Sequence, residues 1–163
     1  MAETIVRKFD PNKWVLVPTR HALERLRKRE LSPSADVPEA VHALRRLAST
    51  TKVLIKNDVW VAVGTERTLV LSEMRTMSLE KYQDELKRHL SRLHPTYTVY
   101  VITAEGCRPT SAGQLDVDDL ATEFEYARFS GEARTLVLAR EGEKALAVVT
   151  VRPPRKKERK LIE

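Results

Sequence analysis

Apolar residues recur at two different periods along the chain and predict alternating strands and helices. A β-branched run at 14–17 ends at Pro18, and Thr19 then stands where a helix N-cap is expected. Apolar residues then recur at helical spacing and predict a helix that runs to about Arg29, and a second helix is expected after Asp36. One short strand followed by two amphipathic helices is therefore the predicted start of the fold.

Three short apolar runs follow and predict an antiparallel meander of strands at 52–56, 59–63 and 68–72. Its turns are expected at Asn57-Asp58 and at Gly64-Thr65-Glu66. A long amphipathic pattern at 79–93 then predicts a helix, with basic residues late in the helix as the dipole favours. We expect its leucine stripe to pack across the meander.

The remaining pattern predicts a smaller group of elements. It consists of a strand at 98–103, a loop at 105–113, a helix capped by Asp116 and stopped by Gly131, and a hairpin of 134–140 with 145–151. The fold class is therefore α+β, an antiparallel meander packed by helices and followed by a strand–helix–hairpin unit. We expect a basic α+β region at 1–94, that unit at 95–152, and a basic flexible tail at 153–163.

One pentapeptide occurs twice. Arg-Thr-Leu-Val-Leu stands at 67–71 and again at 134–138, each time at the start of a predicted strand. Because β-branched and leucine-rich pentamers recur by chance among strands, the sequence leaves open whether the two copies mark a duplication.

Composition excludes several classes of site. The single cysteine, Cys107, has no disulfide partner and no companion cysteines for zinc, and the five glycines are scattered and make no phosphate loop. No apolar run approaches the roughly 18 residues of a membrane span. We therefore expect a cytoplasmic protein without a metal, a cofactor or a membrane partner; the oligomeric state is not fixed by the sequence.

Charge is unevenly distributed along the chain. Residues 1–94 carry 18 Lys+Arg and 12 Asp+Glu, residues 95–151 carry 5 and 9, and residues 152–163 carry 6 and 2. Clustered Lys and Arg raise the local potential and gain free energy by counterion release from a polyanion. The expected partner is nucleic acid, RNA in preference to DNA, or a protein that processes nucleic acid.

The first predicted helix carries the most specific candidate chemistry. His21, Arg25 and Lys28 stand at i, i+4 and i+7 and so share one helix face. A histidine can move a proton near neutral pH, and a guanidinium can stabilise the charge that develops on a phosphodiester. His21 and Arg25 are therefore the candidate catalytic residues for metal-independent RNA cleavage. The alternative is that this face is simply solvated, as charged helix faces usually are.

Other cations complete the candidate site if their side chains face the same cleft. The candidate nucleic-acid-binding residues are Lys28, Lys52, Lys56, Arg67, Arg75, Arg155, Lys156 and Lys157.

Residues 14–93 resemble the RelE/ParE-type toxin superfamily in two respects. The elements follow the order strand, two helices, meander and helix, and the first helix contains His-Ala-Leu-Glu-Arg-Leu-Arg-Lys-Arg at 21–29. The resemblance implies a metal-independent endoribonuclease or a gyrase-directed toxin, with His21 and Arg25 matching the helix signature.

Two classes of function are carried forward from the sequence. The first is a small protein that engages nucleic acid, with RNA cleavage of the toxin type as its sharpest form. The second is a non-enzymatic interaction protein, either a phage or mobile-element factor or an accessory subunit of a ribonucleoprotein, that binds a host nucleic-acid machine. Convergence of His21, Arg25 and a strand cation in one concave site would favour the enzyme.

Overall fold

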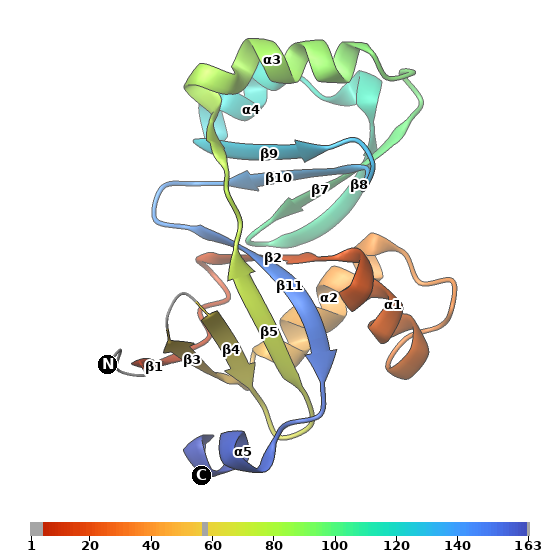
Figure 1. Ribbon diagram of the computed structural model, residues 1–163. Coiled ribbons are helices and arrows are strands. Elements are labelled where there is room, and N and C mark those ends of the chain that lie inside the picture. The colour runs from red at the N-terminus through yellow and green to blue at the C-terminus, as the bar shows by residue number, and fades with distance from the viewer. Residues whose placement is uncertain (1–4, 57–58, 163) are drawn as a thin grey trace.

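The computed structural model describes residues 5–56 and 59–162, and it has an α+β fold built on two sheets (Figure 1). The first sheet has six strands in the order β1-β3-β4-β5-β11-β2, and the second has five in the order β6-β9-β10-β7-β8. The turn predicted at Asn57-Asp58 lies outside the described residues.

The six-stranded sheet contains the predicted meander. Its strands are β1 (Ile5–Lys8), β2 (Trp14–Pro18), β3 (Lys52–Lys56), β4 (Val59–Val63), β5 (Thr68–Glu73) and β11 (Lys144–Arg152). β3, β4 and β5 pair antiparallel in sequence order, as predicted. β1 was not predicted, and it extends the meander by pairing antiparallel with β3.

Two helices cover one face of this sheet. Thr19 caps α1 (Arg20–Arg29) by accepting a hydrogen bond from the backbone N–H of Ala22, and Asp36 caps α2 (Val37–Ala48) in the same way. Both predicted caps are confirmed. The apolar stripes of the helices pack on a core that includes Trp60 and Leu69 from the sheet.

The five-stranded sheet has its own helices. Its strands are β6 (Met77–Ser78), β7 (Thr98–Thr103), β8 (Gly106–Ser111), β9 (Tyr126–Ser130) and β10 (Thr135–Ala139). The helices are α3 (Leu79–Ser91), the single 3-10 turn η1 (Ala112–Gln114) and α4 (Val117–Glu123). Figure 1 shows α3 and α4 on the face of this sheet that points away from the first sheet.

The packing predicted for the long helix is wrong. Leu86 and Leu90 of α3 are buried, as expected, but their core partners are Val99 and Leu136 of the five-stranded sheet. An amphipathic stripe requires an apolar surface to cover, but it does not specify which surface. The predicted end of the meander region at residue 94 therefore falls within the second group of elements.

The predicted hairpin of 134–140 with 145–151 is also wrong. β10 pairs with β9 and β7, whereas β11 pairs antiparallel with β5 and parallel with β2. The predicted loop at 105–113 is largely β8, and the predicted helix to Gly131 ends at Glu123 and continues as β9.

The chain therefore inserts one lobe into another. Residues 77–139, here called the inserted lobe, lie between β5 and β11, which are neighbours in the first sheet. The remaining described residues form the main lobe. The chain crosses between the lobes at 74–76 and at 140–143, and the backbone N–H of Met74 bonds the carbonyl of Ala145 at 2.8 Å.

An apolar junction joins the lobes. Its buried residues, here called the junction core, are Val15, Val17, Val41, Ile102, Ala104, Val137, Ala139 and Ala145. At its edge, β8 approaches α2 so closely that a Cβ built on Gly106 would lie 3.2 Å from Cε1 of His42. Gly106 also has φ +137°, a backbone conformation that L side chains rarely adopt.

Replacing Ile102 with alanine tests the junction core. Ile102 is fully buried, so Ile102→Ala is expected to lower the free energy of unfolding by about 2–5 kcal/mol. Val59→Ala is the control, because Val59 is 51% exposed and an exposed change of this kind costs about 0.5 kcal/mol or less. Urea unfolding followed by circular dichroism measures both, and equal effects would contradict the assigned junction.

Candidate functional site

The first helix presents the predicted polar face to solvent. Ala22 and Leu26 of α1 are fully buried against the sheet, whereas His21 and Lys28 are exposed and Arg25 is half-buried. His21 lies in the first turn, and the basic side chains at 27–29 lie in the last turn, where the helix dipole stabilises positive charge. The helix therefore carries a cationic outer face, but His21 stands at its other end.

Arg67 and the neighbouring Arg27 have structural partners. Arg67 is paired with Glu30 at the C-terminal end of α1, and its side chain is less than one-third exposed. Arg27 donates from Nε and Nη2 to the carbonyl of Ala35 at 2.9 and 2.7 Å, which ties α1 to the loop before α2. Arg67 therefore lies about one helix length from His21 and is already neutralised.

The strand lysines point away from the first helix. Val53 lies in the core beneath α1 and α2, and side chains alternate between the faces of a strand, so Lys52 and Lys56 project from the opposite face. Arg75 lies in the connection at 74–76, where its carbonyl accepts a hydrogen bond from Arg128 at 3.0 Å. Among the described residues, the strand cations do not converge on His21 and Arg25, which was the condition that would favour the enzyme.

A further cation, which was not predicted from the sequence, lies on the same sheet face as Lys52. Lys8 of β1 is directly opposite Lys52 in the antiparallel ladder, so both side chains leave the sheet on the same side. Both are exposed. Within residues 5–56 and 59–162, neither forms a hydrogen bond or ion pair from its ammonium group.

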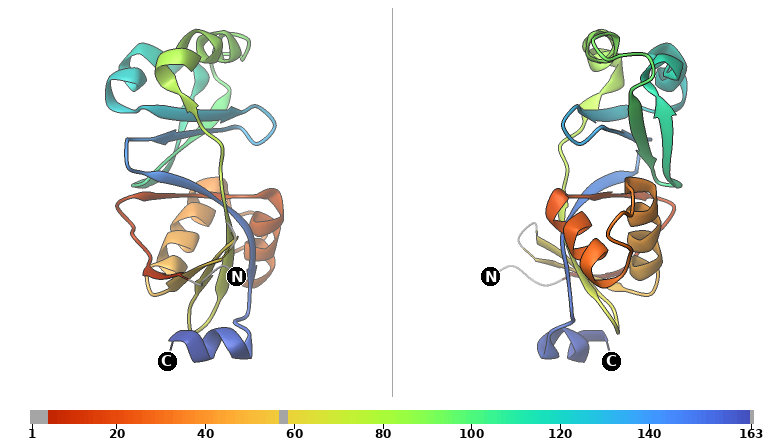
Figure 2. Two further views of the ribbon diagram at one scale, coloured as in Figure 1. Left: turned by 60° about the vertical axis from the view of Figure 1, so that its left-hand side comes forward. Right: turned by 90° about the vertical axis from the view of Figure 1, so that its right-hand side faces the viewer.

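The C-terminal residues form a docked helix instead of the flexible tail predicted at 153–163. α5 (Lys156–Ile162) lies at the end of the main lobe remote from the inserted lobe (Figures 1 and 2). It contacts β4. Cross-strand register runs from Lys8 through Lys52, Val63 and Thr68 to Arg152, so α5 and the two lysines occupy the same end of one sheet face.

Glu158 holds α5 in place. Its carboxylate accepts a bidentate pair from Arg152, Nη1 to Oε1 at 2.7 Å and Nη2 to Oε2 at 2.8 Å. It also accepts the backbone N–H of Arg155 at 2.8 Å. The Arg152 hydrogen bond lowers the pKa of Glu158, and the same bond raises the pKa of Arg152. The only carboxylate described on α5 is therefore used for docking.

The other charged side chains of α5 are cations that face solvent. They are Lys156, Lys157, Arg159 and Lys160, and Arg155 just before the helix is exposed as well. We call Lys8, Lys52 and these five cations the lysine–α5 surface. Four of its members, Lys52, Arg155, Lys156 and Lys157, were predicted from the sequence.

Net charge separates along the axis that joins the lobes. Over residues 1–76 and 140–163 the chain has 22 Lys+Arg and 13 Asp+Glu, whereas residues 77–139 have 7 and 10. The main lobe is thus strongly basic and the inserted lobe acidic. α5 lies at the end of the main lobe farthest from the acidic lobe (Figure 1).

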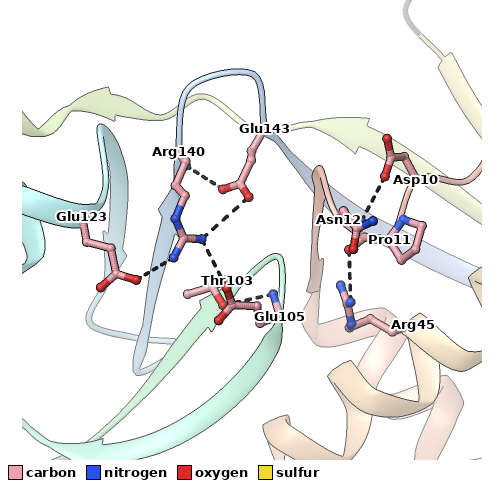
Figure 3. Close-up of polar contacts among 9 residues, drawn as sticks. All are labelled: Asp10, Pro11, Asn12, Arg45, Thr103, Glu105, Glu123, Arg140 and Glu143. Carbon is pink, nitrogen blue, oxygen red and sulfur yellow. Dashed lines mark hydrogen bonds and ion pairs between the residues drawn. The ribbon is translucent and has the colours of Figure 1, made fainter.

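A cluster of charges at the junction is internally balanced. Arg140, in the second crossing, lies between two carboxylates of the inserted lobe, with Nη2 2.6 Å from Glu123 and Nη1 3.6 Å from Glu105 (Figure 3). Its guanidinium also stacks 4.5 Å from the ring centroid of Phe124. Nearby, Arg45 donates to the carbonyl of Pro11 at 3.1 Å. The Arg140 contacts hold the second crossing against the inserted lobe and leave little of the Arg140 charge for a ligand.

Other reactive groups are poorly placed for catalysis. A cavity of about 310 Å³ between α2 and β8 is lined by His42, Glu105 and Cys107, among others. Burial raises the pKa of Cys107 to about 12, so its thiol stays protonated at neutral pH and is a poor nucleophile. Within the part of the chain that the structure describes, no group of three or more His, Cys, Asp or Glu is placed to hold a metal ion.

Comparison with known proteins gives no assignment: no family model matches the chain, and no curated protein matches it either. No helix within the described residues is long and apolar enough to cross a membrane.

The docking of α5 is expected to depend on pH through Glu158. Because the folded-state pKa of Glu158 is depressed, its contribution is present above the ordinary glutamate pKa of about 4.3 and is lost as pH falls through the lower folded value. The backbone amide signals of 156–161 in NMR spectra should therefore move toward random-coil positions at acid pH.

Glu158→Gln should reproduce that loss at neutral pH, because the amide keeps the size of the side chain but cannot form the charged bidentate pair. Glu132→Gln, an exposed change in the inserted lobe, is the control. Unchanged α5 signals in Glu158→Gln at pH 7 would contradict the role assigned to this carboxylate.

Proposed function

We propose that this protein binds nucleic acid through the lysine–α5 surface of its main lobe. The observation that carries the proposal is the directly opposed pair Lys8 and Lys52, which lies beside a basic helix on one sheet face. Like charges opposite each other on neighbouring strands are destabilising. A bound phosphate removes that repulsion, so the apo protein is arranged to gain from an anionic ligand.

The proposal concerns binding in preference to cleavage. Metal-independent cleavage needs an acid, a base and charge stabilisation around one phosphodiester. His21 and Arg25 share the face of α1, but Lys52 and Lys56 leave the sheet on the side opposite to that helix. Counterion release, in contrast, needs only cations on one accessible surface, and the lysine–α5 surface provides them.

The charge separation between the lobes supports an oriented complex. The acidic inserted lobe is repelled by a polyanion, and the basic pole is attracted to it, so diffusional encounter favours one orientation of the protein. The alternative partner is an acidic surface of a protein that processes nucleic acid. Both ligands are anionic, and direct binding to purified nucleic acid distinguishes them.

Replacing the lysine pair provides the test. Lys8→Gln/Lys52→Gln should weaken binding to a labelled RNA and reduce the slope of log K against log salt by about 2, because each phosphate-contacting lysine contributes about 1. Fluorescence anisotropy at several salt concentrations measures the slope. The control is Lys81→Gln/Arg92→Gln, which removes the same charge from exposed positions of the inserted lobe.

Equal effects of the two double variants would contradict the assigned surface, and absence of binding to any nucleic acid at low salt would favour the protein partner. Deleting α5 is a poor substitute for these variants. The deletion also removes Glu158 and leaves Arg152 without its ion-pair partner, so it alters the main lobe as well as the charge of the surface.

Cleavage is tested in the same samples. With chelator present, we expect the RNA to be recovered intact, because the sheet lysines do not face His21. If cleavage is found instead, His21→Ala and Arg25→Ala should each reduce its rate by roughly 10²-fold. Cleavage that disappears in both variants would move the function to the endoribonuclease proposed from the sequence.

A further inference from the structure

The aromatic residues are divided between the lobes in a way that bears on the ligand. Nine Phe, Trp and Tyr residues occur in the chain, and the main lobe holds only three: Phe9, Trp14 and Trp60. Each of the three is no more than 6% exposed. Trp14 packs edge to face against both of the others, with ring centroids 5.3 Å apart in each pair.

No aromatic ring of Phe, Tyr or Trp is therefore available on the lysine–α5 surface. The four rings that are partly exposed belong to the acidic inserted lobe, and they are Tyr97, Tyr100, Tyr126 and Phe129. Two of these, Tyr97 and Tyr100, are further occupied by the guanidinium of Arg134, which lies 4.9 and 5.8 Å from their centroids. Cations and accessible aromatic rings are thus on opposite lobes.

The sheet face beside the lysine pair is aliphatic. On the strands β1, β3, β4 and β5, the row next to Lys8 and Lys52 consists of Val6, Leu54, Val61 and Val70. These side chains cannot donate or accept hydrogen bonds, so they cannot recognise the edges of unpaired bases. The surface offers positive charge but neither stacking nor polar contacts to bases along its centre.

This composition distinguishes between forms of nucleic acid. Proteins that bind single strands combine a basic groove with aromatic side chains on which successive bases stack. A double helix keeps its bases stacked internally and presents phosphates at twice the axial charge density of one strand. A surface of cations without exposed aromatic rings therefore gains more binding free energy from a double helix than from a single strand.

We propose that the lysine–α5 surface binds double-helical nucleic acid through its phosphates, and binds single strands more weakly. This inference rests on the proposed function and specifies its ligand. The ligand chemistry is a pair of phosphate backbones held in a helix, which double-stranded RNA and double-stranded DNA both provide.

The full-length protein is titrated, at one salt concentration, with a labelled single-stranded RNA, the RNA duplex of the same sequence, and the corresponding DNA duplex. We expect each duplex to bind several-fold more tightly than the single strand. The duplex with the lower dissociation constant identifies whether RNA or DNA is the preferred ligand. Single-strand affinity equal to or above that of both duplexes would overturn the inference and leave the proposed function intact. Absence of binding to all three would instead overturn the proposed function.

A gain-of-function variant provides an independent test. Val6 is 51% exposed and lies on the same strand and face as Lys8, so Val6→Tyr adds a stacking ring beside the lysine pair at a position that tolerates a larger side chain. We expect it to raise single-strand affinity by about tenfold, the lower part of the range for one stacked base, and to raise duplex affinity by a smaller factor.

Met77→Tyr is the matched control, because Met77 is 46% exposed on the inserted lobe. If Val6→Tyr changes single-strand and duplex affinity equally, or changes neither while Lys8→Gln/Lys52→Gln weakens both, the missing aromatic ring does not set the preference for a duplex and the inference is wrong.

Discussion

The contact between the two sheets is the constraint on which the rest of the architecture depends. The chain crosses between lobes only at 74–76 and 140–143, and two short connections alone would leave the lobes free to rotate. The junction core instead removes apolar side chains of both sheets and of α2 from water, at roughly 25 cal/mol per Å² of apolar area. The Arg140 cluster then adds directional contacts at its rim. Burial supplies the affinity between the lobes, and the charges set their orientation.

Local signals in the sequence were sufficient for most helices and for the meander. Thr19 and Asp36 cap their helices through short-range hydrogen bonds, and such bonds depend only on neighbouring residues. Pairing between distant strands has no comparable local signal. β11 reads as half of a hairpin because a glycine turn precedes it, yet its partners are β5 and β2. The four-residue β1 was missed because it is too short to show a period, and β8 was missed because Gly106 and Pro109 resemble a loop.

The candidate site was predictable in composition but not in geometry. The cations of α1 and of the C-terminal segment are evident from the sequence, and helical spacing places His21, Arg25 and Lys28 on one face. The face chosen by Lys52 and Lys56 depends instead on the strand register, because a shift of one residue would have turned both toward α1. The position of Lys8 opposite Lys52 was known only once the structure showed that β1 pairs with β3. The resemblance to the RelE/ParE-type toxins stays a prediction.

The insertion of one lobe between β5 and β11 also orders events during synthesis. The hydroxyl of Thr19 bonds the carbonyl of Val148 across 129 positions of the chain, and β2 has β11 as its only strand partner in the six-stranded sheet. The inserted lobe is contiguous in sequence and can fold as it leaves the ribosome. The sheet of the main lobe cannot be completed until β11, which ends at Arg152, has been synthesised. Until then, α1 and α2 lack part of the sheet surface on which they pack. The lysine–α5 surface, which we propose binds a polyanion, is completed by β11 and α5 and therefore forms only after the acidic lobe has been synthesised.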